Sequence, residues 1–309
     1  MSDGSLFSRF RRGLEPLLPA RMRSGITVPV VRLHGAIGMA TPLRPGITFS
    51  GVAKALERAF AVKGAKAVAL LINSPGGSPV QSHLVFRRIR ALAQEKEIPV
   101  FAFVEDVAAS GGYMLACAAD EIVADRFSIV GSIGVVSAGF GFNRAIDKLG
   151  IDRRVYTAGT RKVILDPFQP EHPEDVAKLK TIQREIHEQF VDLVKERRGG
   201  VLSGSDDTLF SGEFWASGEA LEHGLIDAVG DMRSFLRARY GEKVETPLIE
   251  TAGGWFGRRR PGVGALAALE GTEWFSADLA PFGSSVGAGL ADRLVASAEE
   301  RALWGRYGL

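Results

Sequence analysis

The chain has 309 residues, of which 46% are hydrophobic, enough to fill the core of one large domain or two modest ones. Its 38 basic and 36 acidic residues are spread along the sequence and leave a formal net charge of +2, which excludes the basic footprint of a nucleic-acid-binding protein. The only cysteine, Cys117, excludes an intramolecular disulfide and is expected to be a small buried hydrophobe. The five histidines lack metal-ligand spacing, so neither a metal nor a cofactor is expected.

Residues 1–25 form a basic N-terminal segment with five arginines between Arg9 and Arg23. This segment lacks the apolar core of a signal peptide or a membrane span. One later stretch, Phe127 to Asn143, is uncharged and approaches spanning length. Because glycines and serines interrupt it, we expect buried sheet followed by a loop that lines a site.

Strand and helix signals alternate from about Ile26 to Arg239. Strands separated by helices in this rhythm imply βαβ crossovers, and hence a mostly parallel sheet with helices outside it. The predicted strands are Ile26 to Leu33, Ala67 to Ile72 and Val100 to Val104, and the predicted helices between them are Phe49 to Val62 and Val80 to Gln94.

Two glycine-rich turns, Ser74 to Ser78 and Ala109 to Gly112, each follow a strand and open a helix. That places both at the carboxyl edge of the sheet, where ligands bind in open α/β folds. Ser110, in Ala-Ala-Ser-Gly-Gly-Tyr, can project its hydroxyl from such a turn, although a serine at this position is also an ordinary helix N-cap.

A serine hydroxyl needs a proton acceptor to become a nucleophile. No histidine occurs between His83 and His172, so Lys162, in Ala-Gly-Thr-Arg-Lys, is the candidate base. A lysine base must be neutral, which requires its pKa to fall from about 10.4 toward ~7 to 8 through burial or nearby positive charge. Arg161 and the apolar run after Lys162 favour this; an ordinary surface lysine is the alternative.

Pro173 to Arg198 is predicted to be one long helix, because its apolar residues recur at three- or four-residue steps. It lies outside the βαβ rhythm and is expected to be an arm or a packing surface. The composition changes again after Thr246, so we expect a domain over residues 26–245 and a C-terminal extension over residues 246–309. Trp255 and Phe256 lie close to three arginines there, which leaves open either a peripheral contact with an anionic membrane or a solvated linker with packed aromatics.

Five motifs, taken together and in order, resemble the S49 serine peptidases, the group of signal peptide peptidase A and protease SohB. The resemblance covers roughly Ile26 to Arg239, and it implies a crotonase-like (ClpP-like) α/β fold, a Ser-Lys dyad and a homo-oligomer. The motifs are Asn73-Ser-Pro-Gly-Gly, Val107-Ala-Ala-Ser-Gly-Gly-Tyr, Gly131-Ser-Ile-Gly-Val, Lys162, and the run from Ser211 to Asp227.

The resemblance also implies roles for single residues. Lys162 would take the proton of Ser110, whose oxygen attacks a peptide carbonyl, while backbone N–H groups of Gly77 and Gly111 hold the oxyanion. Ser132 would orient the lysine amine, and the alternative is a plain turn serine.

The expected substrates are hydrophobic peptides, such as remnant signal peptides, which would pair as added strands with Gly131 to Val136 and Gly77 to Val80. Family members commonly carry an N-terminal membrane anchor and often have an acidic or small polar residue after the lysine. Here no anchor is seen and Val163 follows the lysine. We therefore expect a cytoplasmic protein, or one peripheral at the inner membrane of a bacterium.

Two other functions stay open. An acyl-CoA hydratase or isomerase of the same fold would need carboxylates in the cleft, and Glu105 and Asp106 are available. A catalytically silent scaffold would bind peptides or membranes through the oligomer and the C-terminal aromatic residues.

Overall fold

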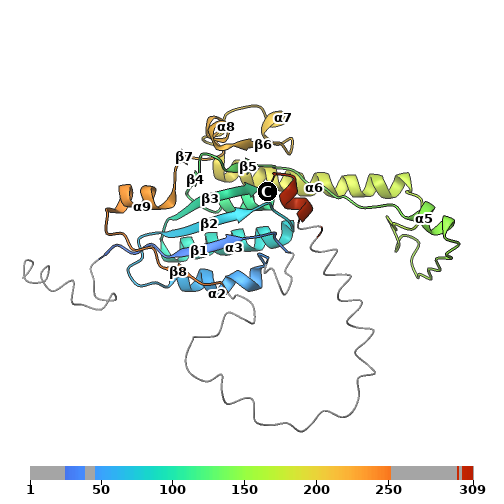
Figure 1. Ribbon diagram of the computed structural model, residues 1–309, viewed down its shortest axis with the longest axis horizontal. Helices are drawn as coiled ribbons and strands as arrows, with labels where there is room; N and C mark the ends of the chain where they lie inside the picture. The colour runs from blue at the N-terminus through green and yellow to red at the C-terminus, as the bar shows by residue number, and fades with distance from the viewer. Residues whose placement is uncertain (1–24, 39–45, 252–297, 299–300, 309) are drawn as a thin grey trace, which may run out of the picture.

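The computed structural model describes residues 25–38, 46–251, 298 and 301–308 (Figure 1). Strands and helices alternate through the first half of the chain, and shorter elements follow the longest helix. In chain order the elements are β1 (Val30–His34), α2 (Phe49–Phe60), β2 (Val68–Ser74), α3 (Pro79–Lys96), β3 (Val100–Ala109), α4 (Gly111–Ala116), β4 (Glu121–Ala124), β5 (Ile129–Gly131), α5 (Asn143–Lys148), α6 (Pro173–Arg198), α7 (Asp206–Leu209), β6 (Phe214–Ala216), α8 (Ser217–Glu222), β7 (Ala228–Val229), α9 (Met232–Tyr240) and β8 (Leu248–Ile249).

The strands form one sheet in the order β6-β5-β3-β2-β1-β8, with β4 and β7 joined to β3 on a side branch. Every strand pair in this sheet is parallel except β5 with β6. The prediction of an α/β fold with a mostly parallel sheet flanked by helices is confirmed, and the topology agrees with the ClpP-like fold that the resemblance implies.

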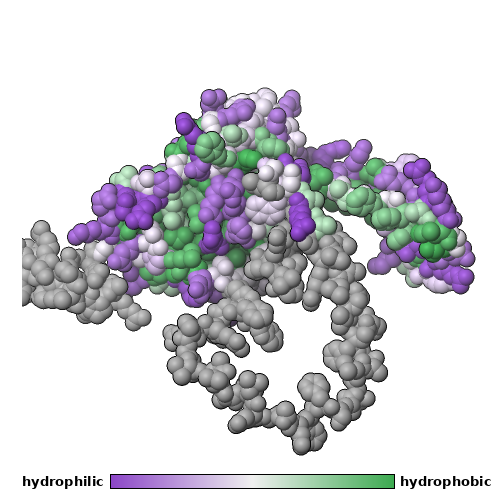
Figure 2. Space-filling model, in the orientation of Figure 1, coloured by the Kyte–Doolittle hydropathy of each residue, from purple (hydrophilic) through white to green (hydrophobic). Residues whose placement is uncertain are grey.

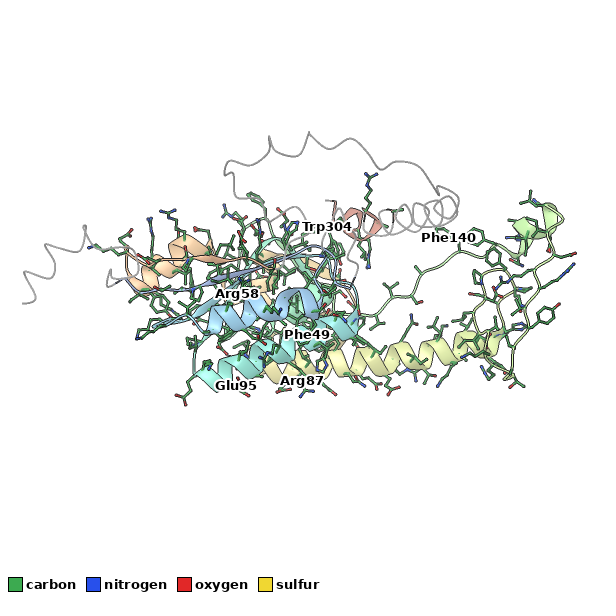
Figure 3. The ribbon with its side chains drawn as sticks, turned by 90° about the horizontal axis from the view of Figure 1, so that it is seen from below. Phe49, Arg58, Arg87, Glu95, Phe140 and Trp304 are labelled. Carbon is green, nitrogen blue, oxygen red and sulfur yellow. The ribbon has the colours of Figure 1, made fainter. Side chains whose placement is uncertain are left out.

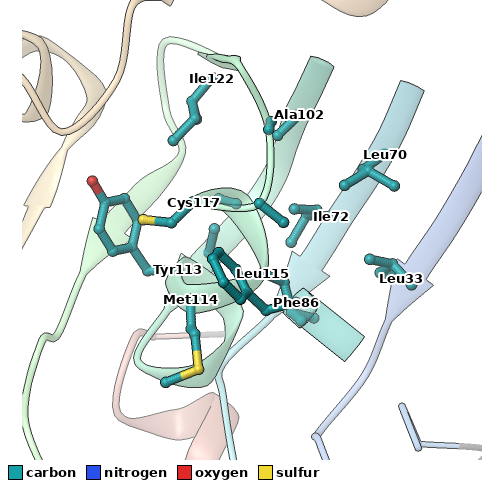
Figure 4. Close-up of a cluster of buried hydrophobic side chains, with 14 of the residues drawn as sticks. Leu33, Leu70, Ile72, Phe86, Ala102, Tyr113, Met114, Leu115, Cys117 and Ile122 are labelled. Carbon is teal, nitrogen blue, oxygen red and sulfur yellow. The ribbon is translucent and has the colours of Figure 1, made fainter. Parts of the chain in front are cut away.

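The main core lies between the sheet and the helices α2, α3 and α4. β2 alternates between its two faces, so Leu70 and Ile72 face these helices while Ala69 faces α9 on the other side. Figure 4 shows Leu70 and Ile72 of β2 beside Leu33 of β1, with Leu115 of α4 and Cys117, just past the end of α4, next to them. Cys117 is fully buried, as expected, and burial raises the pKa of its thiol to about 12.

β3 is longer than predicted because it contains a bulge. Val104 pairs with Ile72 of β2, but the next pair joins Ala108 to Ser74, so two extra residues lie on β3. The bulge lets β3 pair with β4 through its first half and with β5 through Val107 to Ala109. The last residues of β3 therefore pair with β5 instead of β4. Ser110 follows directly after them.

Residues 136–186 form an extension, here called the arm, that leaves the body of the molecule (Figures 1 and 3). One limb is the N-terminal half of α6, which begins at Pro173 as predicted. The other limb includes α5 and returns through residues 149–172, and the amide of Phe142 donates to the carbonyl of Pro167, which joins the outgoing and returning segments of this limb. With 26 residues, α6 is about 39 Å long at ~1.5 Å per residue, long enough to carry the tip far from the sheet.

The surface of the arm carries large apolar residues among its charged ones. Figure 2 shows hydrophobic residues gathered near its tip, and Figure 3 shows Phe140 well away from the body. We expected buried sheet followed by a loop that lines a site: the chain is buried at Ile133, just after β5, whereas the loop runs out along the arm, where Phe140 is 81% exposed. The large apolar residues exposed on the arm are Val136, Phe140, Phe142, Leu149, Ile151, Val155, Tyr156, Ile164 and Ile182.

The sheet extends past residue 245, where we predicted the domain to end, because β8 pairs with β1 through Leu248 and Ile249. Residues 1–24 and most of the extension, including Trp255 and Phe256, lie outside the described residues. Within the described part of the chain, no helix combines the length and the apolar character that a membrane crossing requires.

Candidate active site

Ser110 occupies a strained turn between β3 and α4. Its backbone has φ 52° and ψ −122°, in the region with positive φ that residues with a side chain rarely adopt. Its amide donates to the carbonyl of Gly131 at 2.8 Å, and its carbonyl accepts from Met114 to start the helix. Ser110 occupies the N-cap position, but its side chain makes no capping hydrogen bond, so the hydroxyl is not committed to the helix. The ordinary N-cap role considered from the sequence is not what the structure shows.

The glycine-rich loop after β2 packs directly against this turn. A Cβ at Gly76 would lie 2.8 Å from the Cβ of Ser110, so only glycine allows the two turns to approach this closely. Gly77 follows at φ 140°, and a Cβ there would lie 2.2 Å from the carbonyl oxygen of Ile37. The carboxyl ends of β2 and β3 therefore bring Gly77 and Ser110 together, as predicted from the sequence.

The amides of Gly77 and Gly111 both lack an acceptor among the described residues. Ile37 pairs with the residues on either side of Gly77, since its N–H donates to Gly76 and its carbonyl accepts from Ser78. That pairing leaves the N–H of Gly77 directed away from Ile37. Gly111 is the first residue of α4, where an N–H has no partner within the helix. Two unpaired donors beside a serine hydroxyl are the arrangement that an oxyanion requires.

Ser132 lies beside the same turn. Gly131, whose carbonyl accepts from Ser110, directly precedes it. Ser132 is buried, has φ 52°, and donates its amide to the carbonyl of Glu213 at 2.6 Å. His187 of α6 holds this segment through a 3.2 Å hydrogen bond between its ring Nε2 and the carbonyl of Ile133.

Lys162 is the one predicted site residue that the chain does not bring to the others. Its neighbour Arg161 pairs with Asp175, in the first turn of α6, at 3.2 Å. The contact of α6 with the strand beside Ser110 comes at His187, roughly 18 Å further along the helix at ~1.5 Å per residue. Lys162 is exposed on the arm, beyond the reach of a single lysine side chain from Ser110.

Two carboxylates lie within β3, at the bulge before the nucleophile turn, and each has a partner. Glu105 pairs with Arg32 at 3.0 Å. Asp106 accepts a hydrogen bond from the side-chain amide of Asn73. Asn73 is 5% exposed and lies near the end of β2, just before the loop that carries Gly77, so this bond ties together the two strands that lead into the turns of the site. In the described residues, no group of three or more histidine, cysteine or acidic side chains is placed to hold a metal.

Helix α4, which begins directly after Ser110, is anchored to the end of α6. Arg197 donates to the carbonyls of Cys117 and Ala119, which lie just past the end of α4. Arg198, whose side chain is 6% exposed, donates to the carbonyl of Gly224 and pairs with Asp227 at 2.8 Å.

The hydroxyl of Tyr113 on α4 donates to the carbonyl of Leu225, and burial raises the pKa of Tyr113 well above its usual value. Arg198 and Tyr113 therefore hold the same short segment, Gly224 to Asp227, from two helices. This polar network therefore holds the C-terminal end of α6 to helix α4, which begins directly after the nucleophile.

Comparison with known proteins gives the chain a family. The sequence model of peptidase family S49 matches residues 92–243. Over 298 residues, 96% of this chain, it is 55% identical to the Na(+)/H(+) antiporter NhaA of Brucella abortus. The chain spans only 39% of that relative's length, so that name carries no activity over to it. It is 33% identical over 218 residues to "Putative protease slr0021" of Synechocystis, a match that covers 66% of this chain and 76% of the relative.

Among solved structures, a ClpP1 mutant from Listeria monocytogenes overlaps 67% of this chain and 94% of its own, with a TM-score of 0.43 and 14% identity. We assign the fold of this chain from its own strand order and not from this similarity. Another relative is the chloroplastic serine protease SPPA of Arabidopsis thaliana, which is 35% identical over 185 residues, 59% of this chain and 27% of the relative. The chain belongs to peptidase family S49.

Proposed function

We propose that this chain is a serine peptidase in which Ser110 is the nucleophile. The observation that carries the proposal is the Ser110 turn itself, where a strained backbone at φ 52° frees the hydroxyl from helix capping. Strain of this kind is kept only where the surrounding structure enforces it, and it is concentrated at functional sites. The close approach of Gly76 supplies that enforcement here.

We also propose that the amides of Gly77 and Gly111 form the oxyanion hole. Both are unpaired among the described residues, and Gly111 adds the positive end of α4. Removing one such donor typically costs roughly 3 to 4 kcal/mol of transition-state stabilisation.

The base in this proposal is Lys162 of a second copy of the chain. Within one copy, the arm holds Lys162 far from Ser110, and the lysine is exposed. A lysine that acts as a base has to be neutral, and burial favours the neutral amine. Soluble monomers rarely expose large apolar patches, and the arm exposes nine large apolar side chains, from Val136 to Ile182. Packing the arm of one copy against the body of another would bury both this apolar surface and the lysine. Catalysis would then depend on self-association.

The reaction then follows in two halves. Nζ of Lys162 takes the proton from Oγ of Ser110 as the oxygen bonds to the peptide carbonyl carbon, and the amides of Gly77 and Gly111 hold the negative oxygen. The carbon–nitrogen bond breaks as Nζ returns the proton to the leaving amine. Water, deprotonated by the same Nζ, hydrolyses the acyl-enzyme and regenerates Ser110.

Ser132 is proposed to orient the incoming lysine amine. It is buried beside Gly131, whose carbonyl fixes the amide of Ser110, so it lies where a base approaching Ser110 would pass.

The proposed substrates are hydrophobic peptides, such as remnant signal peptides. Segments Gly131 to Val136 and Gly77 to Val80 flank the nucleophile turn, and Val80 and Val136 are 66% and 67% exposed at their ends. An extended peptide that pairs with either segment would place alternate side chains against these apolar surfaces.

The pairing of Glu105 and Asp106 argues against the alternative that the chain is an acyl-CoA hydratase or isomerase. That alternative needed free carboxylates in the cleft, whereas Glu105 is paired with Arg32 and Asp106 with Asn73. The compartment, cytoplasmic or peripheral at the inner membrane, stays a prediction.

The experiment that tests the peptidase proposal is labelling of the purified protein with a fluorophosphonate probe, followed by mass mapping of the adduct. We expect the adduct on Ser110 in the wild-type protein and none in the Ser110→Ala and Lys162→Ala variants. Folded protein that takes no adduct on Ser110 across several probes and pH values would instead leave the silent scaffold as the better account.

A second prediction concerns the link between Asn73 and Asp106. Replacing Asp106 with alanine removes the acceptor that ties together the strands leading into the two turns, and we expect the rate of Ser110 labelling to fall about 10- to 100-fold, since small displacements at a reacting centre cost this much. Asp106→Asn keeps an acceptor oxygen and should retain most of the rate. Thermal melting of both variants separates this effect from unfolding, and equal labelling rates for the two would show that the hydrogen bond does not position the site.

A further inference from the structure

A small apolar cluster that includes aromatic residues lies next to the nucleophile turn. Val107 and Ala109 of β3, with Ile129 of β5, form a small apolar cluster on the sheet face opposite α3. Phe214 of β6 completes it, because β6 pairs with β5 and Phe214 lies opposite Gly131. We call this surface the aromatic groove. Since Ala109 is the residue before Ser110, whatever fills the groove lies next to the nucleophile turn.

The C-terminal segment of the chain fills the groove in this structure. Tyr307 is buried against Val107 and Ala109, and its ring meets Phe214 edge to face, with the centroids 5.1 Å apart. Trp304, three residues earlier on the same short helical turn, lies against His34 at the end of β1, 5.9 Å between ring centroids. Figure 3 shows Trp304 on this segment beside the body of the molecule.

The segment therefore crosses the carboxyl edge of the sheet with two aromatic anchors. One anchor rests on β1 and the other on β3, β5 and β6, so together they cross the end of the sheet where the Gly77 loop and Ser110 also lie. Apart from Leu303, Trp304 and Tyr307, its described residues from Arg301 to Gly308 are exposed. Aromatic anchors in pockets, surrounded by weakly bound neighbours, are the pattern of peptide recognition.

One detail shows that Tyr307 is not the ideal occupant. Its hydroxyl is buried and has no hydrogen-bond partner among the described residues. A buried hydroxyl without a partner weakens binding, because its contacts with water are lost and not replaced. The groove is apolar at its base, so a phenylalanine ring would fill it without this penalty.

We propose that the aromatic groove is a binding site for an aromatic side chain of a peptide, and that residues 301–308 occupy it as a displaceable ligand supplied by the chain itself. The site selects an apolar ring, phenylalanine above tyrosine, held by Phe214 and the β3 residues beside the nucleophile. Its link to catalysis rests on the proposed role of Ser110, whereas its occupancy by peptide does not.

The test measures binding in the full-length Ser110→Ala protein, so that no turnover is needed. The probe is a fluorescein-labelled synthetic peptide with the sequence of residues 301–309, and its affinity is followed by fluorescence anisotropy. Tyr307→Ala empties the groove, so the probe should bind it at least about tenfold more tightly than it binds the parent chain, because the competing ligand is gone. Tyr307→Phe, the matched control, fills the groove better and should bind the probe more weakly than the parent.

Two further variants keep the outcome clear. Adding Phe214→Ala to the Tyr307→Ala chain should abolish the gain, because the edge-to-face partner of the ring is lost. Deletion of residues 301–309 should reproduce the tight binding of Tyr307→Ala. Equal affinities for the parent, Tyr307→Ala and Tyr307→Phe would overturn the proposal. That result would leave fluorophosphonate labelling of Ser110 untouched, so the failure of this site and the failure of the peptidase proposal can be told apart.

Discussion

Mixtures of Ser110→Ala and Lys162→Ala chains are expected to hydrolyse peptides although neither variant does so alone. Each variant by itself should lose at least about a thousandfold in kcat/KM, since either loss disables the dyad. In co-assembled chains, however, an intact Ser110 from one variant can meet an intact Lys162 from the other. Random assembly at equal amounts leaves about a quarter of the sites intact, so about a quarter of the wild-type rate should return.

The measurement uses the two variants co-expressed with different affinity tags and purified through both tags in turn. Lys148→Ala, which removes another exposed arm lysine, is the matched control and should keep wild-type activity in every mixture. Mixed assemblies that stay as inactive as the separate variants would mean that the dyad does not form between copies.

The largest expected loss of stability follows replacement of Arg198. Its side chain is 6% exposed and holds the carbonyl of Gly224 and the carboxylate of Asp227, which in turn accepts from the amide of Ile122. Removing the buried guanidinium leaves the carbonyl of Gly224 without its donor and takes the counter-charge from Asp227, which is 28% exposed, so Arg198→Ala should lower the free energy of unfolding by about 2 to 3 kcal/mol. Denaturant titration followed by circular dichroism measures it.

The control for this prediction is Arg237→Ala. Arg237 pairs with Glu242 at 3.4 Å on the surface, where Glu242 is 81% exposed, so its loss should cost less than about 1 kcal/mol. If the two variants unfold at the same denaturant concentration, the contacts of Arg198 at the C-terminal end of α6 do not contribute the expected stability.

Much of the body could be predicted from local pattern. The bounds of α6 were predicted to the residue, because a proline starts the helix and two glycines follow its last turn. The meeting of Gly77 with Ser110 could also be predicted, since both follow parallel strands and such turns share one edge of the sheet. These features depend on short stretches of sequence and on rules that hold for every parallel sheet.

Other features depend on contacts that sequence spacing does not encode. The bulge in β3 arises from the packing of three neighbouring strands, and nothing in the run from Glu105 to Val107 signals it. The distance between Ser110 and Lys162 depends on the direction in which α6 leaves the body, which its apolar periodicity leaves undetermined.

The packing of Tyr307 against β3 could not be predicted from the sequence either. The 57 residues from 250 to 306 separate it from β8, and a long connection of this kind places almost no limit on where its end can bind. An aromatic pair at three-residue spacing, Trp304 and Tyr307, was the only signal, and such a pair occurs on many surface helices.

The central claim, a dyad formed between copies, is tested most directly by cross-linking. A chain carrying both Ser110→Cys and Lys162→Cys is prepared in isotopically heavy and light forms, co-assembled in equal amounts, and treated with a short bismaleimide. Native Cys117 is fully buried and should not react. Mass spectrometry then reports whether the peptides joined through positions 110 and 162 come from one chain or two. The account predicts heavy–light pairs in about half of the linked peptides; linked peptides that are only heavy–heavy or light–light would contradict it.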